Sequence, residues 1–70
     1  MMPLTISNVG ETSYIRKIIG KDDVRQHLAE LGFVVGEPVT VVSKVSGNMI
    51  LNVKGTRIAL GQSMTNRIMI

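Results

Sequence analysis

The side chains that could do chemistry in this 70-residue chain are few. His27 is the only histidine, and cysteine is absent. A catalytic centre needs a nucleophile, a base and a group that orients the base, and no second histidine or cysteine is present to complete such a set around His27. We therefore expect that the chain is not an enzyme, and that His27 is a solvated residue of a helix.

Asp22 and Asp23 are the remaining candidates for binding a hard cation. Both stand just before a run with helical spacing, where a carboxylate can cap a helix and suits the positive end of its dipole. Gln26 follows Asp23 by three residues, which is the spacing of a capping box. Because capping explains the two acids, we expect no metal ligand among them. The single glycines form no phosphate-binding motif, so no cofactor is predicted.

The net charge of +3 reflects eight Lys and Arg residues against five acids, a mild excess. Small barrels that bind nucleic acid usually combine stacking aromatics with a basic groove. Here only Tyr14 is an aromatic on an expected strand, and the basic residues are spread along the chain. A nucleic-acid-binding barrel is therefore the alternative, not the favoured interpretation. No apolar run approaches the roughly 20 residues of a spanning helix, and no signal-peptide pattern is visible, so we expect a cytoplasmic protein that does not insert into a membrane.

One helix is expected among short strands. Val24, Leu28 and Leu31 fall on one helical face, and Gly32 is placed to end the helix in a left-handed conformation. Apolar alternation and turn residues predict strands at residues 13–19, 39–45, 49–54, 57–60 and 67–70, and one helical turn within residues 61–66. Residues 3–10 should form a short edge segment or a 3₁₀ turn, with Leu4 and Ile6 on the core.

The predicted fold class is all-β with one inserted helix. Residues 1–70 should form a single domain, a small SH3-like barrel of about five short strands in the order β-α-β-β-β-β. A flat sheet of that size would leave two exposed edges, and curling into a partly open barrel hides them. The imperfect alternation of Ile15, Ile18 and Ile19 also predicts a bulge or a strand end near Lys17.

The apolar run at residues 33–35 directly follows the helix, and a barrel this small can hardly bury all of it. An exposed apolar patch usually marks a partner surface. The alternative is that Phe33 simply packs on the barrel. The candidate contact surface consists of Arg25, Leu28, Ala29, Gly32, Phe33 and Val34.

Several segments together resemble the ferrous iron transport protein A (FeoA) family. The segment HLAELGFVVGEPVTVV at residues 27–42 is similar to that family's helix ending in leucine and glycine, followed by a hydrophobic pair, a glycine and a valine-rich strand. The hairpin SGNMILNVKG, the following TRIAL and the closing NRIMI resemble its second half. The resemblance covers the chain from about Leu4 to Ile70.

The resemblance implies an SH3-like barrel that accompanies FeoB, a membrane transporter of ferrous iron with a GTP-binding cytoplasmic domain. It implies an accessory, regulatory protein that acts by protein–protein contact, and it carries over no catalytic residue. The same fold occurs in iron- and manganese-dependent repressors, so a metal-sensing SH3-like domain is a second alternative. This chain has no helix-turn-helix module, which favours the transporter accessory.

Overall fold

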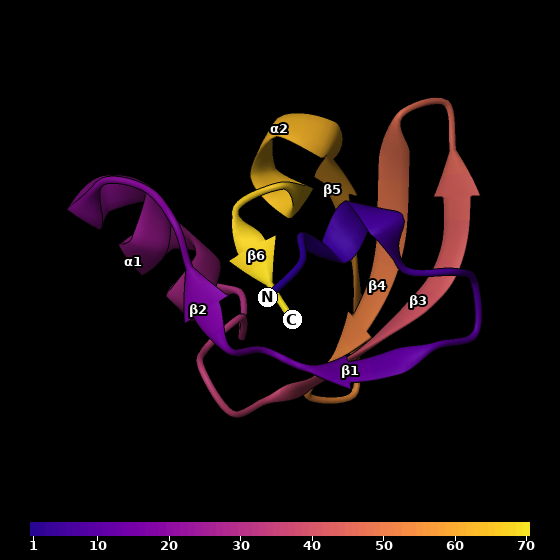
Figure 1. Cartoon of the computed structure of the whole chain (residues 1–70), viewed down its shortest axis with the longest axis horizontal. Helices are drawn as coiled ribbons and strands as arrows, with labels where there is room; N and C mark the ends of the chain where they lie inside the picture. Colours follow the sequence, from indigo (N-terminus) through magenta and orange to yellow (C-terminus); the bar gives the residue numbers. More distant parts are fainter.

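The computed structural model describes residues 1–70, in which one longer helix lies at one side of a set of short strands (Figure 1). The strands are β1 (Thr12–Tyr14), β2 (Lys17–Ile18), β3 (Pro38–Val45), β4 (Asn48–Val53), β5 (Thr56–Gly61) and β6 (Ile68–Met69). The helices are the 3₁₀ turn η1 (Leu4–Ile6), the longer α1 (Asp22–Glu30) and the single turn α2 (Gln62–Thr65).

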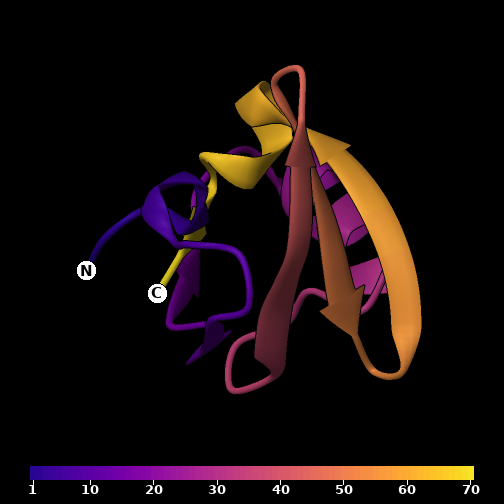
Figure 2. The ribbon, with the colours of Figure 1, turned by 90° about the vertical axis from the view of Figure 1, so that its right-hand side faces the viewer.

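The strands form two antiparallel sheets. One is four-stranded, in the order β1-β3-β4-β5, and the other is the pair β2-β6. Seen from the side, β3, β4 and β5 form one wall, and β2, β6 and the chain ends lie opposite it (Figure 2). The strands do not close into a continuous barrel. The order of elements agrees with the sequence-based prediction, with α1 inserted before β3.

The structure divides the first predicted strand into two. β1 pairs with β3, whereas β2 pairs with β6, so six strands replace the predicted five. The switch occurs at Ile15 and Arg16: the Ile15 N–H donates to the Glu37 carbonyl at 3.0 Å, and the Arg16 N–H donates to the Met69 carbonyl at 2.8 Å. One strand that serves two sheets cannot keep a single alternation. The irregular spacing of its isoleucines follows from this change of sheet.

The core lies between the two sheets and α1. Aliphatic side chains dominate it, and Phe33 is its only aromatic residue. The buried cluster consists of Leu4, Ile15, Leu28, Phe33, Val39, Val41, Met49, Leu51, Val53, Leu60 and Ile68. A 70-residue chain hides only about 60% of its unfolded surface, so this thin core leaves little margin for a lost contact.

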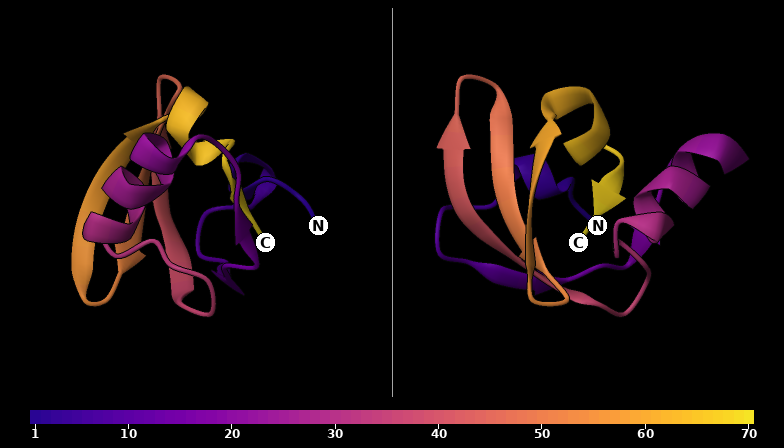
Figure 3. Two further views of the ribbon diagram at one scale, coloured as in Figure 1. Left: turned by 90° about the vertical axis from the view of Figure 1, so that its left-hand side faces the viewer. Right: turned by 180° about the vertical axis from the view of Figure 1, so that it is seen from behind.

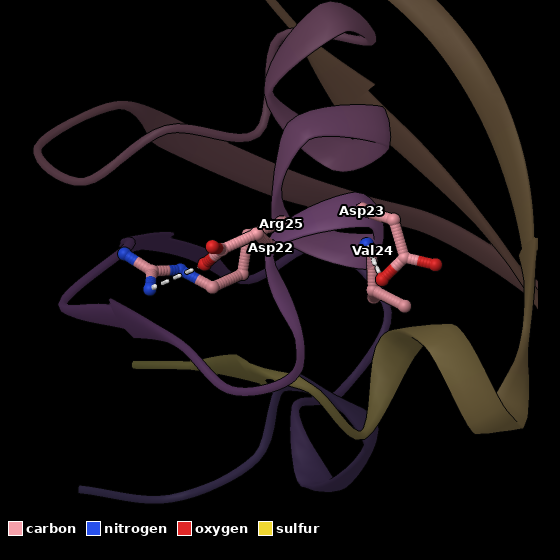
Figure 4. A network of polar contacts seen from close by, with 4 residues as sticks. All are labelled: Asp22, Asp23, Val24 and Arg25. Carbon is pink, nitrogen blue, oxygen red and sulfur yellow. Dashed lines mark hydrogen bonds and ion pairs between the residues drawn. The ribbon is translucent and has the colours of Figure 1, made fainter.

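The N-terminus of α1 differs from the prediction. The N-cap residue is Lys21, whose side chain makes no capping hydrogen bond, and the two aspartates lie inside the first turn. Asp23 Oδ1 accepts a hydrogen bond from the Val24 N–H at 2.9 Å (Figure 4). The predicted capping box is therefore wrong. The two carboxylates instead stabilise the helix through its dipole, which favours negative charge in the first turn.

The C-terminus of α1 is closed by a Schellman motif. The Phe33 N–H donates to the Leu28 carbonyl and the Gly32 N–H donates to the Ala29 carbonyl, both at 2.9 Å. Gly32 has a φ of 106°, as this motif requires. The side chains that flank the motif, Leu28 and Phe33, are both fully buried. The end of the helix thus turns the chain so that the Phe33 side chain packs in the core.

Two tight hairpins join β3, β4 and β5. The second has Lys54 and Gly55 as its two loop residues, with φ values of 50° and 74°. Two positive values identify a type I′ turn, whose twist matches that of the flanking strands. The register of β4 and β5 then runs without a shift from Val53↔Thr56 to Asn48↔Gly61.

The two chain ends lie side by side (Figure 1). The Met2 N–H donates to the Ile70 carbonyl at 3.0 Å, and the Ile70 N–H donates to the Met2 carbonyl at 2.8 Å. The next segment, η1, is the predicted 3₁₀ turn. Leu4 is buried as expected, but Ile6 is 52% exposed, because only one side of so short a turn faces the core.

We predict that Gly32→Ala lowers the free energy of unfolding by about 1–3 kcal/mol. A Cβ at this position would meet Val53 at 3.5 Å, an ordinary contact, so the cost comes from the positive φ and not from a clash. Urea unfolding measures the change. Gly61→Ala is the control, because its φ of −69° suits alanine and stability should stay equal or rise by up to about 1 kcal/mol. Equal effects of the two substitutions would contradict the role of the cap.

Candidate functional site

A surface groove of about 310 Å³ lies between α1, β2 and the segment that follows α1. It is lined by Arg16, Lys17, Ile18, Arg25, Ala29, Phe33, Val34 and Val35. No acidic side chain is among them. Figure 3 shows α1 and the loop after it from two further sides.

The groove has apolar walls because of how α1 ends. The Schellman motif buries Phe33, so the two valines that follow must continue along the surface toward β3. Val34 is half-buried and Val35 is 65% exposed. Ala29 on the outer side of α1 and the half-buried Ile18 of β2 complete the apolar part. An apolar lining of this kind is what a partner's side chain can cover.

The rim of the groove is basic. Arg16 and Lys17 come from β2 and the residue before it, and Arg25 comes from α1; all three are exposed. Arg25 Nη1 lies 3.9 Å from Asp22 Oδ1, and both side chains are largely solvated (Figure 4). An exposed pair of this kind contributes at most about 1 kcal/mol, so Arg25 remains available to an incoming carboxylate.

The structure brings together four of the six residues predicted as a contact surface: Arg25, Ala29, Phe33 and Val34 all line the groove. The prediction that these six residues form an exposed surface is wrong in part. Leu28, Gly32 and Phe33 are buried, so their role is to hold the helix end and not to present a surface. Phe33 packs on the core, as the alternative interpretation had it. The contact role of the surface as a whole stays a prediction.

Sequence reasoning missed Arg16, Lys17, Ile18 and Val35. The first three lie on the predicted first strand, and nothing local shows that this strand faces the end of α1. Val35 belongs to the same apolar run at residues 33–35. The prediction placed Phe33 and Val34 on the contact surface and left out Val35, which is the most exposed of the three.

Arg16 also borders a second hollow, of about 470 Å³, on the side of the chain ends. Its other lining residues are Met1, Met2, Ser13, Tyr14 and Ile70. Tyr14 is 67% exposed there, away from the core. Apolar surface therefore continues on both sides of Arg16, beyond the groove itself.

The groove offers apolar contact and positive charge. Its lining holds no histidine, carboxylate or hydroxyl that could act as a general base or nucleophile. His27 lies on the exposed side of α1. No group of three or more histidine, cysteine, aspartate or glutamate side chains is placed to hold a metal ion. What the arrangement can do is bind an apolar segment that carries negative charge.

A curled four-stranded sheet, a two-stranded ribbon and one helix inserted ahead of β3 define a small SH3-like protein. Residues 2–70 match the family described as FeoA domain, so the chain belongs to the FeoA family of ferrous iron transport proteins. It is 30% identical over 70 residues to Fe(2+) transport protein A of Methanocaldococcus jannaschii; the match spans all of this chain and 85% of that protein.

Solved structures agree with this assignment. A crystal structure of iron uptake regulatory protein (FeoA) superposes with a TM-score of 0.88 at 28% identity, over 96% of this chain and 89% of that one. FeoA of Stenotrophomonas maltophilia, a prokaryotic SH3 domain protein complexed with zinc, superposes with a TM-score of 0.86 at 28% identity, over 99% and 88% of the two chains.

A manganese-dependent transcriptional repressor shares the fold alone. It superposes with a TM-score of 0.88 at 16% identity, and the match covers 96% of this chain but only 34% of the repressor. The SH3-like unit is thus one part of that longer chain. In the present chain, none of the helices has the length and apolar character that crossing a bilayer requires.

We predict that Phe33→Ala lowers the free energy of unfolding by about 3–5 kcal/mol, because it empties the only aromatic position of the core. Against a total of about 5–15 kcal/mol, that loss removes a large share of the stability. Val35→Ala, two residues away but exposed, should stay within about 0.5 kcal/mol of the parent. Chemical denaturation followed by circular dichroism compares the two. Similar losses for both would refute the division between core and groove.

Proposed function

We propose that this protein is a cytoplasmic accessory protein of ferrous iron uptake, and that it regulates a FeoB-like membrane transporter by binding its GTP-binding cytoplasmic domain. It acts by contact and catalyses no reaction. The observation that carries the proposal is the groove beside α1, which combines an exposed apolar wall with a basic rim.

The chemistry of the groove sets the kind of partner segment. Val34, Val35 and Ile18 would cover one apolar side chain of the partner. Arg16, Lys17 and Arg25 surround that position and would meet carboxylates that flank the anchor. Buried apolar contact supplies most of the affinity of such an interface, whereas rim charges steer association and weaken as salt rises.

Membership in the FeoA family supports the transport role. A relative with 28% identity is described as an iron uptake regulatory protein, which supports a regulatory action for this chain as well.

We predict that Val35→Asp weakens binding to the transporter's cytoplasmic domain about tenfold or more, which corresponds to about 1.4 kcal/mol. The substitution places a charge on the apolar wall and beside the carboxylates of the partner. Val45→Asp is the matched control: Val45 is 55% exposed at the end of β3 and does not line the groove. NMR titration of the labelled protein with the purified cytoplasmic domain, with and without a guanine nucleotide, measures both affinities.

The rim provides a second readout. Lys17→Glu should weaken the same binding and flatten its dependence on salt, because one favourable charge contact becomes unfavourable. Unfolding should change little, since Lys17 is exposed and makes no ion pair. An affinity equal to that of the parent in both Val35→Asp and Lys17→Glu would place the contact elsewhere. The absence of any binding by the parent would reject the proposed partner.

A further inference from the structure

The strand β5 forms one edge of the four-stranded sheet and pairs only with β4. It is the outermost element on its side of the molecule in both side views, and α1 does not extend past it (Figures 2 and 3). None of the backbone–backbone hydrogen bonds that lie outside the helices and strands involves residues 56–61. The outer edge of β5 is therefore open.

The register identifies which groups face outward. The type I′ turn at Lys54 and Gly55 makes Val53↔Thr56 a hydrogen-bonded pair, and bonded pairs recur at every second residue. Thr56, Ile58 and Leu60 thus bond to β4. Arg57 and Ala59 point their N–H and C=O groups away from the sheet, and Gly61 points its N–H the same way. The Gly61 carbonyl already accepts from Thr65 Oγ1 at 2.9 Å.

The opposite side of the sheet is protected in ways that β5 is not. There, β1 is only three residues long, and the free half of β3 carries a register shift between Val41 and Ser43, followed by Lys44. Short strands, bulges and lysines are the usual devices against edge pairing. The six residues of β5 contain no proline, no register shift and one charge, Arg57.

From this contrast we propose that the β5 edge is a self-association surface, on which a second copy of this chain adds its own β5 in antiparallel orientation. A two-fold axis at Ala59 is the arrangement that the sequence of β5 fits, with Ala59 opposite Ala59 of the second copy. Each Arg57 then faces a Gly61, and each Ile58 faces a Leu60. The N–H groups of Ala59 and Gly61 donate across the interface in both directions.

Side chains support this register. Ile58 is only half-buried in the single chain, and pairing with Leu60 of the second copy covers more of it. The backbones of the two Arg57 residues lie four residues apart along the joined strands, about 13 Å at the rise of a strand. That separation exceeds the screening length of about 8 Å at physiological salt, so the charges repel weakly. A shift that placed Arg57 opposite Arg57 would lose this advantage.

The contact is small, because two six-residue strands bury less than the roughly 1,200 Å² of a standard stable interface. The homodimer is therefore weak, and its population depends on protein concentration. It uses residues 57–61, none of which lines the groove beside α1. Self-association and transporter binding can accordingly be tested and rejected separately.

An NMR dilution series of the labelled full chain tests the proposal. The amide signals of Arg57, Ala59 and Gly61 should shift with protein concentration. The translational diffusion coefficient should fall as the concentration rises. Ala59→Lys should raise the dissociation constant about tenfold or more, since it sets two like charges directly opposite each other. Thr56→Lys adds the same charge to the same strand but falls outside the paired residues, so its dissociation constant should stay within about twofold of the parent.

Mixing gives the decisive result. The Ala59→Glu variant alone should also self-associate more weakly than the parent. An equimolar mixture of the Ala59→Lys and Ala59→Glu variants should associate again, because opposite charges now face each other. A mixture of Thr56→Lys with Thr56→Glu should show no such gain over its separate components. Concentration-independent amide signals in the parent would overturn the proposal. So would equal effects of the two lysine variants, or a failure of the Ala59 mixture to associate.

Discussion

The burial of Phe33 by the end of α1 is the interaction on which the rest of the structure depends. In a core of aliphatic residues, one large side chain supplies an unusual share of the buried apolar area. Its position is set by two backbone hydrogen bonds of the Schellman motif and by the positive φ of Gly32. Without that turn, the chain would leave α1 in another direction, and Phe33 and Leu28 could not both face the core.

The groove follows from the same constraint. A chain that places Phe33 inward must carry Val34 and Val35 along the surface until β3 begins at Pro38. Two adjacent apolar side chains outside the core are then unavoidable. Of the basic residues around them, Arg25 lies on α1 itself, whereas Arg16 and Lys17 come from a distant segment that pairs with β6. The site therefore combines a local consequence of the helix cap with a long-range consequence of the β2-β6 pairing.

Features that depend on neighbours in sequence could be predicted. The helical stripe ending at Leu31, the glycine that closes α1 and the alternation of Met49, Leu51 and Val53 each reflect local periodicity, and the structure places them as expected. The split between β1 and β2 could not be predicted, because it depends on which distant strand each half meets. The N-cap failed for a subtler reason: two adjacent aspartates suit both the cap position and the first turn, and propensity alone does not distinguish these positions.

The groove and the β5 edge illustrate two ways in which a very small domain can offer binding surfaces. A core this thin cannot enclose a pocket, so recognition has to use the outside. The groove would act through side chains, and its specificity would come from where the charges of Arg16, Lys17 and Arg25 fall. The β5 edge would act through backbone groups, and the pattern of residues from Arg57 to Gly61 would select a register. Since α1 stands between these surfaces, one copy could occupy the edge of another while both grooves stay open.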